Sequence, residues 1–350
     1  MSAQCIQAVL IWAAGEVIAR EIAADRLVAA VEDPDTLVWV DLVNPTQEDL
    51  TRLVSELGLS PRSVEDAMAP HERPKVTRHA GHLFFQTYAT TLDLPTPRGP
   101  EDADAMATDL AARSAATRGG RLSLSRVSGY VLPRALVTVR LDDKFDMLEV
   151  VRRWEQDYDL TAHAVGALVH GLLDVIVDGH FDTIQQIDDA IEELESILFE
   201  DRLAGRDFLQ VVYGVRKNLV QLRRVVLPMR EVVNGLLRHR LSGQAELDAE
   251  YSDLYDHVLR AAEWTESLRD MVTTLFETHL SLTDNHLNTV MKKLASWAAI
   301  IAVPTAITGW FGQNVPYPGF SQTTGLWMSV VLIIVLSAGL FAAFKSRDWL

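Results

Sequence analysis

The chain has 350 residues, with 48 acidic and 32 basic side chains and a formal net charge of −16. A surface this acidic argues against nucleic acid as a partner, because phosphates bind Lys and Arg, and it favours cations instead. Its single cysteine, Cys5, excludes an intramolecular disulfide framework and fits a reducing compartment.

Residues 1–145 mix strand and helix signals and predict a cytoplasmic α/β domain, an α/β/α sandwich with helices beside a sheet. A helix is expected from Thr46 to Leu57, with Thr46 as its N-cap and Asp49 three residues later. Three β-rich runs predict strands, at residues 5–12, 36–42 and 82–92.

Residues 95–121 are rich in Pro, Gly, Ala and charged side chains, a composition typical of a flexible excursion. Strand character resumes over residues 129–141, and Pro133 is expected at a break between two strands because it cannot donate a ladder hydrogen bond.

Residues 146–246 predict a cytoplasmic helical hairpin. The segment from Asp174 to Asp201 holds ten acidic residues and no Lys or Arg, whereas Gly205 to Arg240 holds eight Lys or Arg. Opposite charge on successive helices indicates complementary faces. Two solvated faces that simply differ in charge are the alternative.

One long helix is predicted over residues 247–312, a stalk whose last part, 294–312, is a first membrane span. No Pro or Gly interrupts the segment from Val258 to Lys293, and Pro304 is the one proline within the span. At about 1.5 Å per residue such a helix is roughly 95 Å long.

A second membrane span is predicted over residues 325–344, and both spans lack charged side chains. Basic residues flank the cytoplasmic ends, namely Lys292 and Lys293 before the first span and the basic tail 345–350 after the second. The connecting loop, 313–324, has none. The chain is therefore expected in the cell membrane, plasma or inner, as a multi-pass protein in the lipid bilayer with both termini in the cytoplasm. A buried helical hairpin in a soluble protein is the alternative reading.

One face of the long helix is acidic, then polar, then small. Steps of three and four residues, 3.5 on average, keep this face toward one axis in a left-handed bundle. A core seam would repeat Leu and Ile, so the pattern favours a water-filled pathway between identical helices. Close helix packing through small residues is the alternative, but it gives no role to the acidic end. The face comprises Glu277, Ser281, Asp284, Asn288, Met291, Ala295, Ala298, Ala302, Thr305, Gly309 and Gly312, with Leu294 beside Met291.

The side chains of this face suit a hard cation. Mg²⁺ loses its water reluctantly, so amide, hydroxyl and carbonyl oxygens would hold the hydrated ion through its water shell. The face carries no Cys or His, the ligands that transition metals prefer.

Several segments together resemble the CorA family of metal-ion transporters. The outer loop opens with Gly312-Gln313-Asn314, and the chain ends in Lys345-Ser-Arg-Asp-Trp-Leu after two spans. The other segments that carry the resemblance are Glu65-Asp66, residues 71–76, 216–223 and 228–231, Tyr255-Asp256-His257 and residues 288–294.

This resemblance implies a homopentameric funnel in which five copies of the long helix line the pore. It implies a selectivity filter at Gly312, Gln313 and Asn314, a polar ring at Asn288, and a hydrophobic constriction at Met291 and Leu294. It also implies regulatory Mg²⁺ between neighbouring cytoplasmic domains, which holds the pore closed. The matching positions are Glu65, Asp66 and Asp253, and Glu277 stands where the family often has a carboxylate.

The family filter is usually Gly-Met-Asn, whereas residue 313 here is Gln, whose amide can contact the waters of an ion. The first hypothesis is a Mg²⁺ uptake channel gated by intracellular Mg²⁺. The second is a ZntB-like or broader transporter of Zn²⁺, Co²⁺ or Ni²⁺, coupled to protons. In it the His79-x-x-His82 pair would contact a soft metal, whereas the alternative is that the two histidines bracket an ordinary turn.

A membrane-anchored enzyme or sensor is the third hypothesis. The sequence contains no GxGxxG, P-loop, HExxH or cysteine cluster, so the chain is expected not to be an enzyme.

Overall fold

The structure is a computed structural model that describes residues 5–20, 26–70, 72–93, 120–157, 159–199, 206–239, 241, 247–313 and 316–350. It forms two compact units, Met1–Thr273 and Thr274–Leu350, which are described separately. The predicted boundaries at 145/146 and 246/247 fall inside the first unit, because the helices there share a core with the sheet.

A seven-stranded sheet in the order β2-β1-β3-β7-β6-β5-β4 forms the centre of the first unit. Neighbouring strands are antiparallel except β3 and β7, which are parallel. The strands are β1 (Ile6–Ala13), β2 (Glu16–Ala19), β3 (Thr36–Val43), β4 (Lys75–Arg78), β5 (Leu83–Asp93), β6 (Arg121–Val131) and β7 (Ala135–Arg140).

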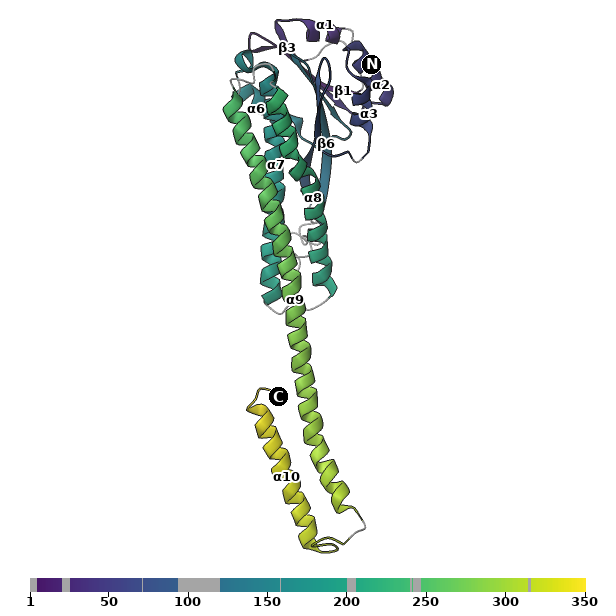
Figure 1. Ribbon diagram of the computed structural model, residues 1–350, viewed down its shortest axis with the longest axis vertical. Helices are drawn as coiled ribbons and strands as arrows, with labels where there is room; N and C mark the ends of the chain where they lie inside the picture. Colours follow the sequence, from purple (N-terminus) through teal and green to yellow (C-terminus); the bar gives the residue numbers. More distant parts are fainter. Residues whose placement is uncertain are drawn as a thin grey trace, which may run out of the picture. The chain divides into compact units, whose positions relative to one another are not determined.

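Helices cover both faces of this sheet, and the alternation of side chains in β3 shows why. Leu37 and Trp39 point into one core, with α6 (Met147–Asp157), α7 (Leu160–Phe199), α8 (Arg206–His239) and the start of α9 (Asp248–Phe311). Val38 and Val40 point into the other, with α1 (Leu27–Glu32), α2 (Gln47–Glu56) and α3 (Pro61–Met68). Figure 1 shows α2 and α3 across the strands from α6 and α7. The predicted α/β/α layering of this part is confirmed.

Two local predictions are confirmed by the backbone. Thr46 caps α2 through a capping box, in which the Asp49 amide donates to Thr46 Oγ1 at 3.1 Å and the Asp49 carboxylate accepts from the Thr46 amide at 3.4 Å. Pro133 lies in the turn between β6 and β7.

The predicted excursion over residues 95–121 needs one correction. Residues 94–119 lie outside the described part of the chain, but Arg121 already begins β6, eight residues before the expected strand. Residues 121–128 read Arg-Leu-Ser-Leu-Ser-Arg-Val-Ser, in which polar side chains outnumber apolar ones, and pairing with β5 over the full length of β6 stabilises them as a strand.

The acidic and basic halves of the predicted hairpin are α7 and α8, which pack on one another. Ion pairs of these helices also run to other neighbours. Arg153 of α6 pairs with Asp178 of α7 at 3.0 Å, and Arg223 of α8 pairs with Glu266 of α9 at 2.8 Å. Complementary charge between α7 and α8 stays a prediction.

Three helices in the described residues are long and apolar enough to cross a membrane, namely His163–Phe199, Asp248–Phe311 and Thr323–Lys345. The first has 78% of its apolar window buried in the protein, which makes it a core helix. The other two windows are 11% and 0% buried, so these helices expose apolar surface as the predicted spans require. The long helix predicted over 247–312 is confirmed as α9, and the second predicted span falls on another helix, α10 (Thr323–Lys345).

Candidate ion pathway and cytoplasmic carboxylates

The polar and small face of α9 is open in the single chain. Met291 is 67% exposed and Leu294 is 71% exposed, although both are large apolar side chains. All of the pathway residues predicted on this helix are exposed: Glu277, Asp284, Asn288, Met291, Leu294, Ala298, Ala302, Thr305 and Gly309. We call this set the stripe.

A different face of the same helix is covered. Ser296 is fully buried and Ile307 is 8% exposed, and Val303 between them is half-buried. With 3.6 residues per turn, Val303 lies roughly 140° around the helix from the middle of the stripe. The Trp297 ring packs near the Phe341 ring of α10, with the two ring centroids 6.5 Å apart. Figure 1 shows α10 beside this part of α9. Packing against α10 therefore leaves the stripe uncovered.

The stripe ends where α9 ends, at the loop predicted to be a filter. The Gly312 amide donates to Thr308 O at 2.8 Å, and a Cβ at Gly312 would lie 3.0 Å from that same oxygen. Tyr317 folds back on the helix end, with its hydroxyl donating to Phe311 O at 3.1 Å. Gly312 and Gln313 are both exposed. Asn314 lies outside the described residues, so the filter stays a prediction.

The predicted regulatory carboxylates Glu65 and Asp66 lie on α3. Glu65 is exposed, whereas Asp66 accepts a hydrogen bond from Lys75 Nζ of β4 at 2.8 Å. Lys75 also donates to Glu72 at 3.1 Å. Burial opposes the charged ammonium, but the hydrogen bonds to Asp66 and Glu72 outweigh it and raise the pKa of Lys75. A cationic side chain thus already neutralises Asp66 within one chain.

Arg126 of β6 holds α3 against the sheet. Its side chain is nearly buried, and its guanidinium donates to Ala67 O at 2.6 Å and also to Ala69 O. These carbonyls end the helix and have few partners of their own, so a cation is favourable there. Tyr130 of the same strand donates to Ser63 O at 2.9 Å. The sheet therefore fixes the backbone that presents Asp66.

Asp253, the third predicted regulatory residue, lies on α9 and is 68% exposed. It contacts His257 one turn later, with Oδ2 and Nε2 3.5 Å apart. Across the described residues, no three His, Cys, Asp or Glu side chains gather closely enough to hold a metal ion. Within the described residues of one chain, Glu65, Asp66 and Asp253 thus form no such group, and the regulatory site stays a prediction.

Comparison with known proteins identifies the family. Residues 34–346 match the family model of the CorA-like Mg²⁺ transporter protein. The chain belongs to the CorA-like Mg²⁺ transporter family. The match covers strands β3 to β7, the long helices and both C-terminal apolar helices.

Individual CorA relatives are similar over most of their length. The cobalt/magnesium transport protein CorA of Thermotoga maritima is 27% identical over 329 residues, covering 91% of this chain and 85% of that protein. Two solved structures share the fold. The CorA magnesium transporter from Methanocaldococcus jannaschii has a TM-score of 0.73 and 22% identity over 98% of each chain. The ZntB cytoplasmic domain from Vibrio parahaemolyticus has a TM-score of 0.55 and 12% identity, covering 80% of this chain and 99% of that domain.

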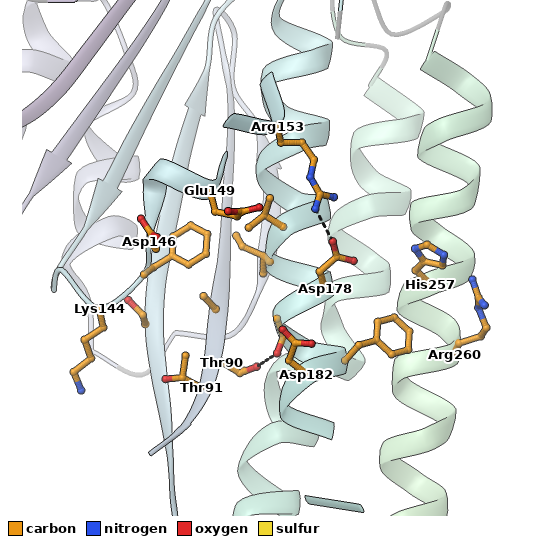
Figure 2. A pocket seen from close by; sticks show the side chains of 17 residues that line it. Thr90, Thr91, Lys144, Asp146, Glu149, Arg153, Asp178, Asp182, His257 and Arg260 are labelled. Carbon is orange, nitrogen blue, oxygen red and sulfur yellow. Dashed lines mark hydrogen bonds and ion pairs between the residues drawn. The ribbon is translucent and has the colours of Figure 1, made fainter. Parts of the chain in front are cut away.

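Sequence reasoning missed a charged cavity of about 780 Å³ in the first unit of this CorA-family chain. Figure 2 shows Arg153 of α6 directed at Asp178 of α7, with His257 and Arg260 of α9 beyond. Burial and the nearby Asp174 charge raise the pKa of Asp178, and Arg153 opposes this shift. The acidic run noted in the sequence contains two of the lining carboxylates, Asp178 and Asp182, but β5, β6 and α6 supply other lining residues, which no sequence spacing reveals.

Proposed function

We propose that the chain is one subunit of a homopentameric divalent-cation channel that admits Mg²⁺ across the cell membrane. The stripe on α9 carries this proposal, because it is exposed in the single chain while another face of the helix is covered. Exposed Met291 and Leu294 would lie in water or lipid beside acidic and amide groups unless copies of the same helix surround them. In a ring of identical subunits, the same helix of each neighbour would shield these side chains from water and lipid.

Oxygen ligands favour a hydrated hard cation as the permeant ion. Thr305 Oγ1 donates to Ile301 O at 3.1 Å, so the lone pairs of the hydroxyl stay available to a hydrated ion. Glu277 and Asp284 would concentrate divalent ions at the cytoplasmic end, and Asn314 would hold the hydrated ion at the outer end. The basic flanks, Lys292 with Lys293 and Lys345 with Arg347, put both termini in the cytoplasm.

Flux into liposomes holding the purified protein tests the transported ion. We expect uptake of Mg²⁺ and Co²⁺ without a pH gradient, because the polar side chains of the stripe offer oxygen ligands and no thiolate or imidazole. The second candidate, a ZntB-like carrier of Zn²⁺ or Ni²⁺, is favoured by Gln313, where the resembled family has Met. Zn²⁺ uptake that requires a pH gradient, with no Mg²⁺ uptake, would replace the first proposal by the second.

Regulation by internal Mg²⁺ is proposed to use Asp66, with Glu65 beside it, and Asp253 of a neighbouring subunit. Bound Mg²⁺ would hold the closed arrangement, and loss of Mg²⁺ would let the carboxylates repel each other. Lys75 competes with the ion, because its ammonium occupies one side of Asp66.

Replacing Lys75 with glutamine is expected to make internal Mg²⁺ a stronger inhibitor. Removing one positive charge about 3 Å from Asp66 should lower the half-inhibiting concentration by roughly 3- to 10-fold. Lys144→Gln, which removes an exposed lysine that donates to Ser123, is the matched control. If internal Mg²⁺ inhibits Lys75→Gln, Asp253→Ala and the unaltered protein equally, Asp66 and Asp253 do not bind the regulatory ion.

A further inference from the structure

The turn between β4 and β5 carries two imidazoles that the transport proposal does not use. The His79 amide donates to His82 O at 2.9 Å and closes this turn. The two rings stack, with centroids 4.7 Å apart and an angle of 17° between their planes. The turn therefore presents a pair of histidines as a unit.

Both imidazoles have a buried nitrogen that nothing in the described chain satisfies. His82 is only 6% exposed, and the Nε2 atoms of His79 and His82 are buried without a hydrogen-bond partner among the described residues. A buried polar atom left unpaired costs about 1–3 kcal/mol, so proteins seldom keep two of them side by side without a use. These atoms are available to a ligand.

His79 and His82 also line a cavity of about 450 Å³ in the first unit. Its walls come from the turn itself, the β6–β7 connection, α7 and the end of α8, and they carry no Asp or Glu. His239, the last residue of α8, adds a third imidazole to the lining.

The absence of carboxylates from the lining decides the class of ligand. Mg²⁺ and Ca²⁺ need oxygen ligands, which the lining side chains of this cavity do not supply as carboxylate. Neutral imidazole nitrogen is a preferred ligand of Zn²⁺, Ni²⁺, Co²⁺ and Cu²⁺. The lining also includes the side chain of Arg78, so imidazole nitrogens are the metal ligands that its side chains offer, and these do not suit the hard ions expected along the stripe.

We propose that His79 and His82 bind a late transition-metal ion of the Zn²⁺, Ni²⁺ and Co²⁺ class at this turn, apart from the ion pathway. Two imidazoles supply protein ligands and water supplies the remaining positions, because no third His, Cys, Asp or Glu in the described residues is close enough to complete a group of three. His239 also lines the cavity. The rings must splay from their stack to share one ion, and the cavity beside them gives the room.

Metal binding to the full-length, tag-free protein in detergent tests this site directly. The protein is stripped with a chelator and titrated with Zn²⁺ against a coloured competitor, in millimolar Mg²⁺ that fills the oxygen sites. We expect one Zn²⁺ per chain to bind in this excess of Mg²⁺, and Co²⁺ in its place to give the visible absorption of a nitrogen-ligated ion. His79→Gln and His82→Gln should each weaken this binding by at least about 10-fold.

His286→Gln is the matched control, since His286 is exposed on α9 and outside the cavity. Its Zn²⁺ affinity should equal that of the unaltered protein. His79 is only half-buried, so His79→Gln keeps the test valid if His82→Gln fails to fold. Zn²⁺ affinity that is the same in His79→Gln, His286→Gln and the unaltered protein would overturn the site, and this result is independent of whether the protein transports Mg²⁺.

Discussion

Mg²⁺ flux is expected to fall by at least about 10-fold when Asn314 is replaced by alanine. In the proposed pore five Asn314 carboxamides ring the outer mouth, and their oxygens accept hydrogen bonds from the water shell of the ion. A hydrogen bond contributes about 0.5–1.5 kcal/mol net, and about 1.4 kcal/mol corresponds to a factor of ten. Loss of the ring therefore removes more than one such contact from the entering ion.

The measurement is initial Mg²⁺ uptake by liposomes at equal protein content. Gln322→Ala is the control, because Gln322 is an exposed amide of the same outer loop, next to the start of α10. Its flux should match that of the unaltered protein. Equal flux in Asn314→Ala and Gln322→Ala would mean that the loop after Gly312 is not the filter.

The long helix and the cap of α2 could be predicted from the sequence, because their signals lie within a few neighbouring residues. The stripe follows from steps of three and four residues on one helix. The lack of Pro and Gly between Val258 and Lys293 predicts that helix over 247–312, and α9 spans Asp248–Phe311. The cap at Thr46 needs only the residue three positions later, and the alternation of Leu37, Val38, Trp39 and Val40 already encodes two covered faces.

The features that escaped the sequence depend on residues far apart in the chain. Arg126 lies on a strand about 60 positions after α3 and donates to a carbonyl at the end of that helix. Lys75 donates to Asp66 from another strand. β6 was predicted too short, because its first residues are held by pairing with β5 rather than by their own hydrophobicity. The two orphaned imidazoles of the β4–β5 turn are visible only once burial is known, since the same spacing also fits an ordinary turn.

The central claim, that copies of the stripe surround the ion pathway, is tested by thiol block at Thr305. The single native cysteine is first removed as Cys5→Ala, and flux is then measured in Thr305→Cys and Val303→Cys. These positions are two residues apart on α9, so they point about 200° apart around the helix. Thr305 is exposed on the stripe, whereas Val303 is half-buried on the covered face.

A cationic methanethiosulfonate reagent that reaches a pore-lining cysteine leaves a bulky positive group in the path of the ion. Such a charge repels divalent cations strongly where little water screens it. We expect the reagent to cut Mg²⁺ flux through Thr305→Cys by at least about 10-fold and to leave Val303→Cys unchanged. Block of Val303→Cys with no block of Thr305→Cys would show that another face of α9 meets the ion, and it would contradict the account.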